Sequence, residues 1–257
     1  MNDFYKKNNL TKSRYSVCIA LDIIGSEHKD NQSDTLSFLT TMINKLNDLF
    51  KKNIVFPFHV RGGDEVIGVL NSFAEGYRAF HEIWLLAIEF QFKIRVGLGF
   101  GKYDTLDIID PHQINGSSVI SAFRARDKYL KDNKDITYKL SGPVQFYSFS
   151  NILDIPYGSI NAVIYTMYEF VKTDKQRVLM WALQTSDPDL TYEEIVKYKL
   201  IGREEWDNQK NDRASISKMI KRMNYKTFRQ MKIDVSILLN SIQSLLDSEW
   251  EWKKIHE

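Results

Sequence analysis

Residues 53–70 read NIVFPFHVRGGDEVIGVL, and this stretch contains the strongest fold signal in the chain. Two apolar runs rich in β-branched and aromatic residues flank the four residues Gly62-Gly63-Asp64-Glu65. A Gly-Gly pair supplies the positive φ angles that a short hairpin turn needs, so the sequence predicts two paired strands with two acids at their turn. Acids on a turn are often only solvated surface groups, and their context therefore decides what they do.

The composition is that of a globular protein. Of the 257 residues, 43% are hydrophobic and 13% aromatic, which is enough for a packed core. The formal charge is only +2, so a role in binding nucleic acid would require a local basic patch. The single cysteine, Cys18, suits a reducing cytoplasm. No secretion signal and no membrane span are expected, and residues 1–11 are expected to be a flexible lead-in to a soluble cytoplasmic protein.

Hydrophobic periodicity predicts the order strand, helix, strand, strand, helix, strand. The predicted strand, helix, hairpin, helix and strand lie at 15–24, 34–51, 53–70, 72–90 and 92–101. This order is that of the split βαβ, ferredoxin-like α/β fold. In that fold the first strand and its helix return to a parallel second strand, so the end of the first strand and the hairpin turn lie at the same edge of the sheet. Asp22, late in the first strand, is therefore expected beside Asp64.

The strand at 92–101 has glycine at alternate positions. Gly97, Gly99 and Gly101 leave one of its faces bare. Glycine weakens a strand, so this pattern predicts that a ligand or another element closely approaches the backbone there.

A helical region is expected after the sheet. A helix at 117–132 and short strands at 136–141 and 144–150 complete a predicted α/β domain at 12–152, and a helical module is expected at 158–257. Residues 213–232 include seven basic residues and no acid. This segment predicts a plain or winged helix-turn-helix that binds duplex DNA. The predicted DNA-binding residues are Arg213, Ser217, Lys218, Lys221 and Arg222. The alternative is a basic, solvated helix that only packs on the α/β domain.

Two carboxylates at one sheet edge repel each other unless a cation lies between them. Mg²⁺ accepts one or two protein carboxylates and fills its other positions with water and phosphate oxygens, and Mn²⁺ is the alternative ion. The expected ligands are Asp22 and Asp64, with Glu65 a weaker candidate because alternation along the strand points it away from Asp64. The alternative interpretation of Asp22 is a mere strand-ending residue, although a buried acid without a partner is costly.

Several motifs resemble known families. The GGDEV turn, together with DIIGS on the preceding strand, resembles the palm domain of GGDEF-type diguanylate cyclases and class III nucleotidyl cyclases. RVGLGFG and GSSVISAFR resemble a strand and a helix of the class III enzymes. Taken together with the helix-turn-helix-like region, these motifs resemble the SatD family of bacterial proteins over nearly the whole chain.

The palm resemblance implies roles for individual residues around a nucleoside triphosphate. The implied metal ligands are Asp22, Asp64 and Glu65, the implied catalytic residues are Asp22, Asp64 and Arg124, and the implied nucleotide-binding residues are Ile23, Gly25, Ser26, Gly62, Gly63 and Arg126. Ile120 stands where class III cyclases have an asparagine, which departs from the cyclase pattern.

The preferred function is nucleotidyl transfer that makes a cyclic or linked nucleotide signal, in a homodimer as the palm resemblance implies. The alternative is a catalytically inactive, nucleotide-sensing and DNA-binding transcriptional regulator. Ile120 favours the regulator, whereas Asp22 and Asp64 favour the enzyme. A structural interaction module is a third option, but it leaves both acids unexplained.

Overall fold

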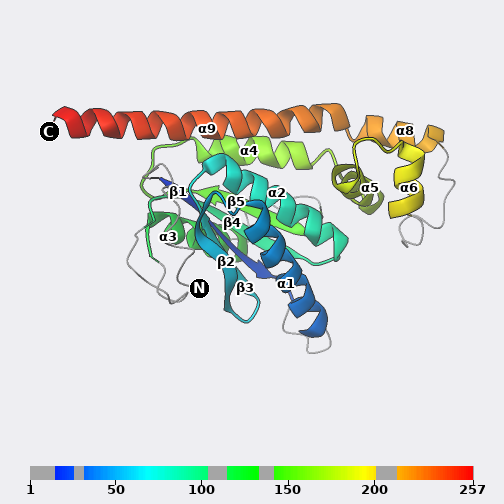
Figure 1. Ribbon diagram of the computed structural model, residues 1–257, viewed down its shortest axis with the longest axis horizontal. Coiled ribbons are helices and arrows are strands. Elements are labelled where there is room, and N and C mark those ends of the chain that lie inside the picture. The colour runs from blue at the N-terminus through cyan, green and yellow to red at the C-terminus, as the bar shows by residue number, and fades with distance from the viewer. Residues whose placement is uncertain (1–14, 26–31, 104–114, 133–141, 201–212, 257) are drawn as a thin grey trace.

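A computed structural model describes residues 15–25, 32–103, 115–132, 142–200 and 213–256. In the helix that begins at residue 32, side chains are described from residue 33 on, and in the helix that ends at residue 256, they are described up to residue 249. The centre of the structure is a five-stranded sheet (Figure 1). The strands are β1 (Ser16–Ile23), β2 (Ile54–Gly62), β3 (Glu65–Leu70), β4 (Ile94–Gly101) and β5 (Val144–Phe149). Their order across the sheet is β2-β3-β1-β4-β5, with antiparallel neighbours except for the parallel pair β4 and β5. Each corresponds to a predicted strand; the strand predicted at 136–141 lies outside the described residues.

Two helices, α1 (Gln32–Leu49) and α2 (Phe73–Glu89), cover one face of the sheet. The Ser72 hydroxyl caps α2 by accepting a hydrogen bond from the Glu75 N–H at 3.3 Å, as predicted. Val17, Ile19 and Leu21 belong to the main core beneath these helices. Because side chains alternate along a strand, Cys18, Ala20 and Asp22 point to the opposite face.

The opposite face is covered by α3 (Ser117–Arg124), which continues into a π-helix, η3 (Ala125–Lys131). The helix predicted at 117–132 is confirmed, but its π-helical second half is not something periodicity indicates. The backbone of α3 and η3 packs directly on the glycine face of β4. A Cβ atom at Gly97 would lie 2.7 Å from the backbone nitrogen of Arg126, and one at Gly101 would lie 2.6 Å from that of Ser118. The glycines of β4 therefore leave room for the backbone of α3 and η3 to approach the sheet closely.

The remaining described elements are helices. The helices are α4 (Tyr157–Tyr168), α5 (Asp174–Thr185), α6 (Tyr192–Lys199), α8 (Arg213–Arg222) and α9 (Tyr225–His256). A capping box of Thr191 and Glu194 begins α6. The sequence pattern predicts a final amphipathic helix at about 234–246; α9 contains this stretch but is longer, since it begins nine residues earlier and continues to His256. It begins earlier because Phe228 continues the buried stripe of Val235 and Leu239 toward the N-terminus.

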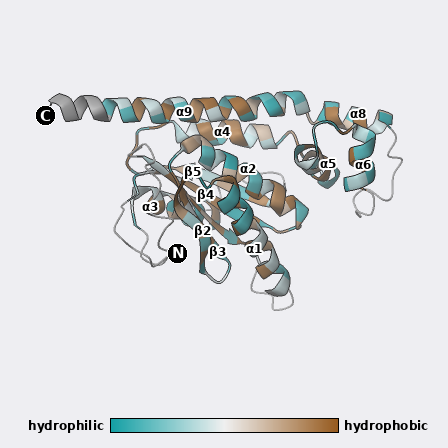
Figure 2. Ribbon diagram, viewed as in Figure 1, coloured by the Kyte–Doolittle hydropathy of each residue, from teal (hydrophilic) through white to brown (hydrophobic). Residues whose placement is uncertain are grey.

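The long helix α9 runs along α2 and α4 (Figure 1). Apolar segments gather in the strands, in α4 and in the central part of α9 (Figure 2). One buried cluster joins the sheet helices to the C-terminal helices: the ring centroids of Trp84 and Tyr168 are 5.0 Å apart, and those of Tyr168 and Phe228 are 5.4 Å apart. A division into domains at 12–152 and 158–257 stays a prediction. Among the helices that the structure describes, none combines the length and apolar character needed to cross a bilayer.

Candidate functional site

Asp22 lies at the end of β1, between one residue of β3 and one of β4. In the ladder, Asp22 is directly opposite Arg95 of β4. On the other side Leu21 pairs with Val66, so the preceding Glu65 lies next to Asp22 at the start of β3. These side chains are on the face covered by α3 and η3. The prediction that Asp22 and the hairpin turn share one sheet edge is therefore confirmed.

The Asp22 carboxylate is 9% exposed and only partly satisfied. Its Oδ2 accepts a hydrogen bond from Arg95 Nη1 at 2.9 Å, whereas Asp22 Oδ1 and Arg95 Nε are buried without a hydrogen-bond partner among the described residues. Burial raises the pKa of Asp22, the positive charges of Arg95 and Arg126 oppose that rise, and the charge of Asp64 adds to it. Asp64 is thus close enough to act on Asp22 electrostatically.

Arg126, the second residue of η3, is only 4% exposed and points at the acids. Its Nη2 donates to Glu65 Oε1 at 2.9 Å and to Asp127 Oδ2 at 3.1 Å, and its Nε donates to Asp127 Oδ1 at 2.6 Å. Arg126 Nη1 is buried with no partner within the described structure. Burial opposes the charged form of Arg126, but the hydrogen bond to Asp127 and the nearby acids raise its pKa. Because π-helices are rare and occur frequently at functional sites, the position of Arg126 in η3 draws attention to this cluster.

Arg124 does not join this cluster. It is exposed, whereas Arg126 is buried, as expected for residues two apart on a helix, which point to different sides. Ile120, one turn before Arg124, is also exposed.

Two further arginines at this end of the sheet, Arg61 and Arg95, were not singled out from the sequence. Arg61 of β2 and Arg126 both lie over the ring of Phe123, with guanidinium carbons 4.5 and 4.9 Å from its centroid. Arg95 faces Asp22 through the register of β1 with β4, which the sequence pattern does not specify. Arg61 carried no signal either, because its neighbour Phe123 is distant in sequence.

The other residues implied by the palm resemblance are placed as follows. Gly63 has φ 59° and forms the hairpin turn with Asp64, and Gly62 ends β2. Gly25 has φ 82° in the turn after β1, and the Ile23 side chain is buried in the core on the α1 and α2 side. Ser26 lies outside the described residues.

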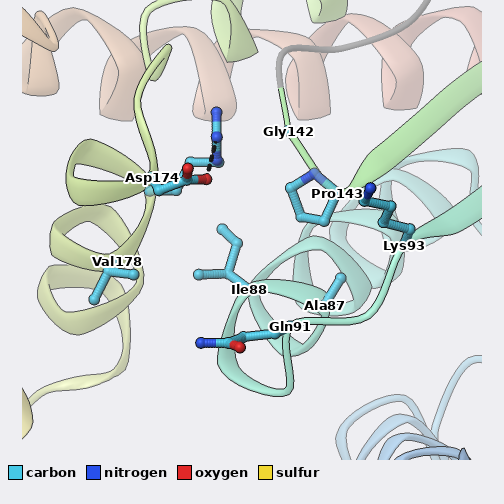
Figure 3. A pocket seen from close by; sticks show the side chains of 9 residues that line it. Ala87, Ile88, Gln91, Lys93, Gly142, Pro143, Asp174 and Val178 are labelled. Carbon is cyan, nitrogen blue, oxygen red and sulfur yellow. Dashed lines mark hydrogen bonds and ion pairs between the residues drawn. The ribbon is translucent and has the colours of Figure 1, made fainter. Parts of the chain in front are cut away.

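Two cavities lie at this end of the sheet, on the side of α1 and α2. One, of about 500 Å³, is lined by Ile23, Ile24, Gly25, Asp34, Thr35, Ser37, Phe90, Gln91, Phe92 and Lys93. The other, of about 510 Å³, is lined by Ala87, Ile88, Gln91, Lys93, Gly142, Pro143, Asp174, Arg177 and Val178 (Figure 3). They share Gln91 and Lys93, and in the second Arg177 is ion-paired with Asp174.

Acidic and basic side chains gather at the end of β1. Arg95 pairs with Asp22, and Arg126 pairs with Glu65 and Asp127, while Asp64 acts on Asp22 electrostatically. Within the described residues, no group of three or more His, Cys, Asp or Glu side chains is arranged to hold a metal ion. A magnesium ion here would therefore have few protein ligands and would take its other oxygens from water and substrate. The unpartnered Asp22 Oδ1 is a suitable ligand atom.

The predicted DNA-binding residues lie on the solvent side of α8. Arg213, Ser217, Lys218, Lys221 and Arg222 are all exposed, whereas Ile216 is buried. Arg213 Nε is 3.6 Å from Glu193 Oε1 of α6. The structure thus presents a basic helix face.

Comparison with known proteins gives one positive result. No curated protein matches the chain. The model of the SatD family matches residues 16–239, which is most of the sequence. The chain therefore belongs to the SatD family.

Proposed function

We propose that the chain binds a magnesium–nucleoside triphosphate at the end of β1 and transfers its nucleotidyl group to a second nucleotide or within one molecule. One observation carries this proposal. The buried carboxylate of Asp22 has an unpartnered oxygen beside the acid of a hairpin turn, and the arginines around it also have unpartnered nitrogens. An apolar or purely structural site would leave these buried polar atoms unexplained.

The sheet topology supports a ferredoxin-like palm. The order β2-β3-β1-β4 with antiparallel neighbours is that of the split βαβ arrangement, to which β5 adds an edge strand. This topology brings the end of β1 and the turn between β2 and β3 to one edge, where palm enzymes hold their metal-binding acids. The topology therefore supports the position of the site, and the chemistry of its side chains supports the proposed function.

Asp22 and Asp64 would hold Mg²⁺ or Mn²⁺, with Glu65 nearby on Arg126. When bound, the ion would neutralise phosphate oxygens and favour ionisation of an attacking hydroxyl. Arg126 and Arg95 would offer their unpartnered nitrogens to phosphate oxygens, since charge-assisted hydrogen bonds to phosphate are among the strong ones. Glu65 and Asp127 keep the Arg126 guanidinium oriented toward the site until a phosphate arrives.

The test is incubation of the full chain with each labelled nucleoside triphosphate and Mg²⁺ or Mn²⁺. Wild type is expected to give a product, Asp64→Asn and Asp22→Asn are expected to give none, and the control Asp48→Asn is expected to behave as wild type, because Asp48 is an exposed acid on α1. The absence of product with every triphosphate and both ions would reject the transferase.

A nucleotide-sensing, DNA-binding regulator is the second candidate. It is favoured by the exposed basic face of α8, by the contact of α8 with α6, and by Ile120 where cyclases have asparagine. If this is correct, triphosphate binds without reacting, and duplex DNA binds with strong salt dependence. Lys218→Ala and Arg222→Ala should each weaken DNA binding and reduce the salt slope by about one, unlike the control Lys51→Ala in the turn after α1. Unchanged binding in both variants would count against α8 as the DNA-binding helix.

A further inference from the structure

One face of α9 is fixed against the body of the protein. Val235 and Leu239 are buried there. Gln243 makes three hydrogen bonds: its Oε1 accepts from the Phe73 N–H at 2.7 Å, and its Nε2 donates to the carbonyl oxygens of Asn71 at 2.8 Å and Tyr15 at 3.3 Å. These contacts set the rotation of α9 about its axis, so its opposite face cannot turn inward.

The solvent side of α9 carries large aliphatic side chains among polar ones. Four large aliphatic side chains are exposed on α9: Ile233 by 51%, Ile237 by 58%, Leu238 by 45% and Leu245 by 65%. No other described element lies beyond α9 on this side, and the helix forms an outer edge of the molecule (Figure 1). An exposed cluster of this kind marks an interaction surface.

We propose that a second copy of this chain covers this face, with the two α9 helices packed antiparallel about a two-fold axis near Leu238. An interface between identical copies must be complementary to itself. The side chains on α9 meet this condition, because two large ones, Ile233 and Ile237, are followed on the same face by two small ones, the exposed Ser241 and Ser244. In an antiparallel pair, the large side chains of each copy lie against the small ones of the other. The antiparallel register sets Ile237 against the partner's Ser241 and Ile233 against the partner's Ser244.

The charges along α9 select the same occupant and orientation. The helix begins with exposed Lys226 and Arg229 and no acid before Asp234, while Asp247 and Glu249 lie near the other end of the described side chains. An antiparallel pair centred near Leu238 brings Arg229 to the partner's Asp247, and a parallel pair would bring like charges together. Antiparallel self-association thus pairs opposite charges at both ends of the contact.

The pairing also sets the distance between the basic helices. Tyr225 begins α9 immediately after α8, and at 1.5 Å per residue the two Tyr225 ends would lie about 40 Å apart. Helix-turn-helix dimers use half-sites about 34–36 Å apart, so this spacing suits the DNA-binding candidate. The self-association itself does not depend on that candidate or on the nucleotide site.

The test is sedimentation velocity of the full chain over a range of concentrations. Wild type is expected to sediment as a dimer and Ile237→Asp as a folded monomer, with circular dichroism to verify the fold. Leu36→Asp is the matched control, because Leu36 is an exposed leucine on α1. A monomeric wild type, or a dimer that survives Ile237→Asp, would overturn the proposal.

A charge exchange tests the orientation. Arg229→Asp and Asp247→Arg are each expected to weaken the dimer, and the double variant is expected to restore it. Leu238→Cys is expected to form an intermolecular disulfide on mild oxidation, since the axis brings the two copies of this position together and the natural Cys18 is buried. A double variant as weak as the single ones, with no crosslink at position 238, would reject the antiparallel register.

Discussion

Replacing Gly97 by alanine tests the packing that positions Arg126. Gly97 is in the middle of β4, and its added Cβ would overlap the carbonyl oxygen of Ala122 and lie 2.7 Å from the backbone nitrogen and 2.9 Å from the Cβ of Arg126. Ordinary contacts of a Cβ begin at 3.4 Å. Two of the three neighbours are backbone atoms, so no rotation of a side chain relieves the overlap, and the α3–η3 segment must move away from the sheet.

The expected cost is about 3 kcal/mol of unfolding free energy, the upper part of the range for overpacked cores, because backbone must move. A matched control is Gly158→Ala in α4, where a Cβ meets nothing within 4 Å. Alanine is a better helix former than glycine, so the control should gain up to about 1 kcal/mol. The assay is urea denaturation of both variants beside wild type.

The same variant has a second readout at the site. Displacing Arg126 lengthens its 2.9 Å hydrogen bond to Glu65 and moves its unpartnered Nη1. Gly97→Ala should therefore also weaken triphosphate binding under conditions where it remains folded, and Gly158→Ala should not. A Gly97→Ala protein as stable as wild type would refute the reasoning that the glycine face of β4 exists to admit α3 and η3.

Three other predictions concern ionisable groups. Arg126→Ala should weaken triphosphate binding at least about tenfold, the loss of charge-assisted contacts, whereas Arg124→Ala, which removes an exposed arginine two residues away, should leave it unchanged in a fluorescence titration. Burial raises the pKa of Asp22, and a metal ligand must be ionised, so the affinity for Mg²⁺–triphosphate should fall as the pH falls through that raised pKa. Calorimetry in buffers of different ionisation enthalpy should detect a release of protons on binding, and Asp22→Asn should abolish this release. Burial lowers the pKa of His81, whose ring contacts the Tyr168 hydroxyl at 2.7 Å, well below its ordinary 6.5. The unfolded state therefore binds the proton first, and the free energy of unfolding should fall as the pH drops below 6.5. His81→Asn should flatten that dependence in denaturation curves recorded between pH 7 and 5, and an equally steep dependence in the variant would contradict this prediction.

The central strands were predictable because β1 and β4 are buried on both faces. Alternation and apolar runs in 15–24 and 92–101 predicted β1 and β4, and the element order alone brought Asp22 to the hairpin turn. The strand patterns are local in the sequence, and the position of Asp22 beside the hairpin turn follows from a topology that few folds share.

The details of the site depend on tertiary contacts that no local pattern encodes. The pairing of Asp22 with Arg95 requires the register of β1 with β4, and the burial of Arg126 requires a π-helical turn within a segment of ordinary helical periodicity. The palm resemblance implied Arg124 for catalysis and Arg126 for nucleotide binding, and of these two only Arg126 is buried. For α9, the basic residues after Tyr225 obscured a stripe that continues through Phe228.

The most direct test of the central claim is an isothermal titration of the full chain with a nonhydrolysable triphosphate, with and without Mg²⁺. Each nucleobase is tried in turn, and Asp64→Asn is compared with the control Asp48→Asn. We predict Mg²⁺-dependent binding of at least one triphosphate to wild type and Asp48→Asn, and its loss in Asp64→Asn. Equal binding to Asp64→Asn, or no binding of any triphosphate to wild type in the presence of Mg²⁺, would contradict the assignment of a metal–nucleotide site to the end of β1.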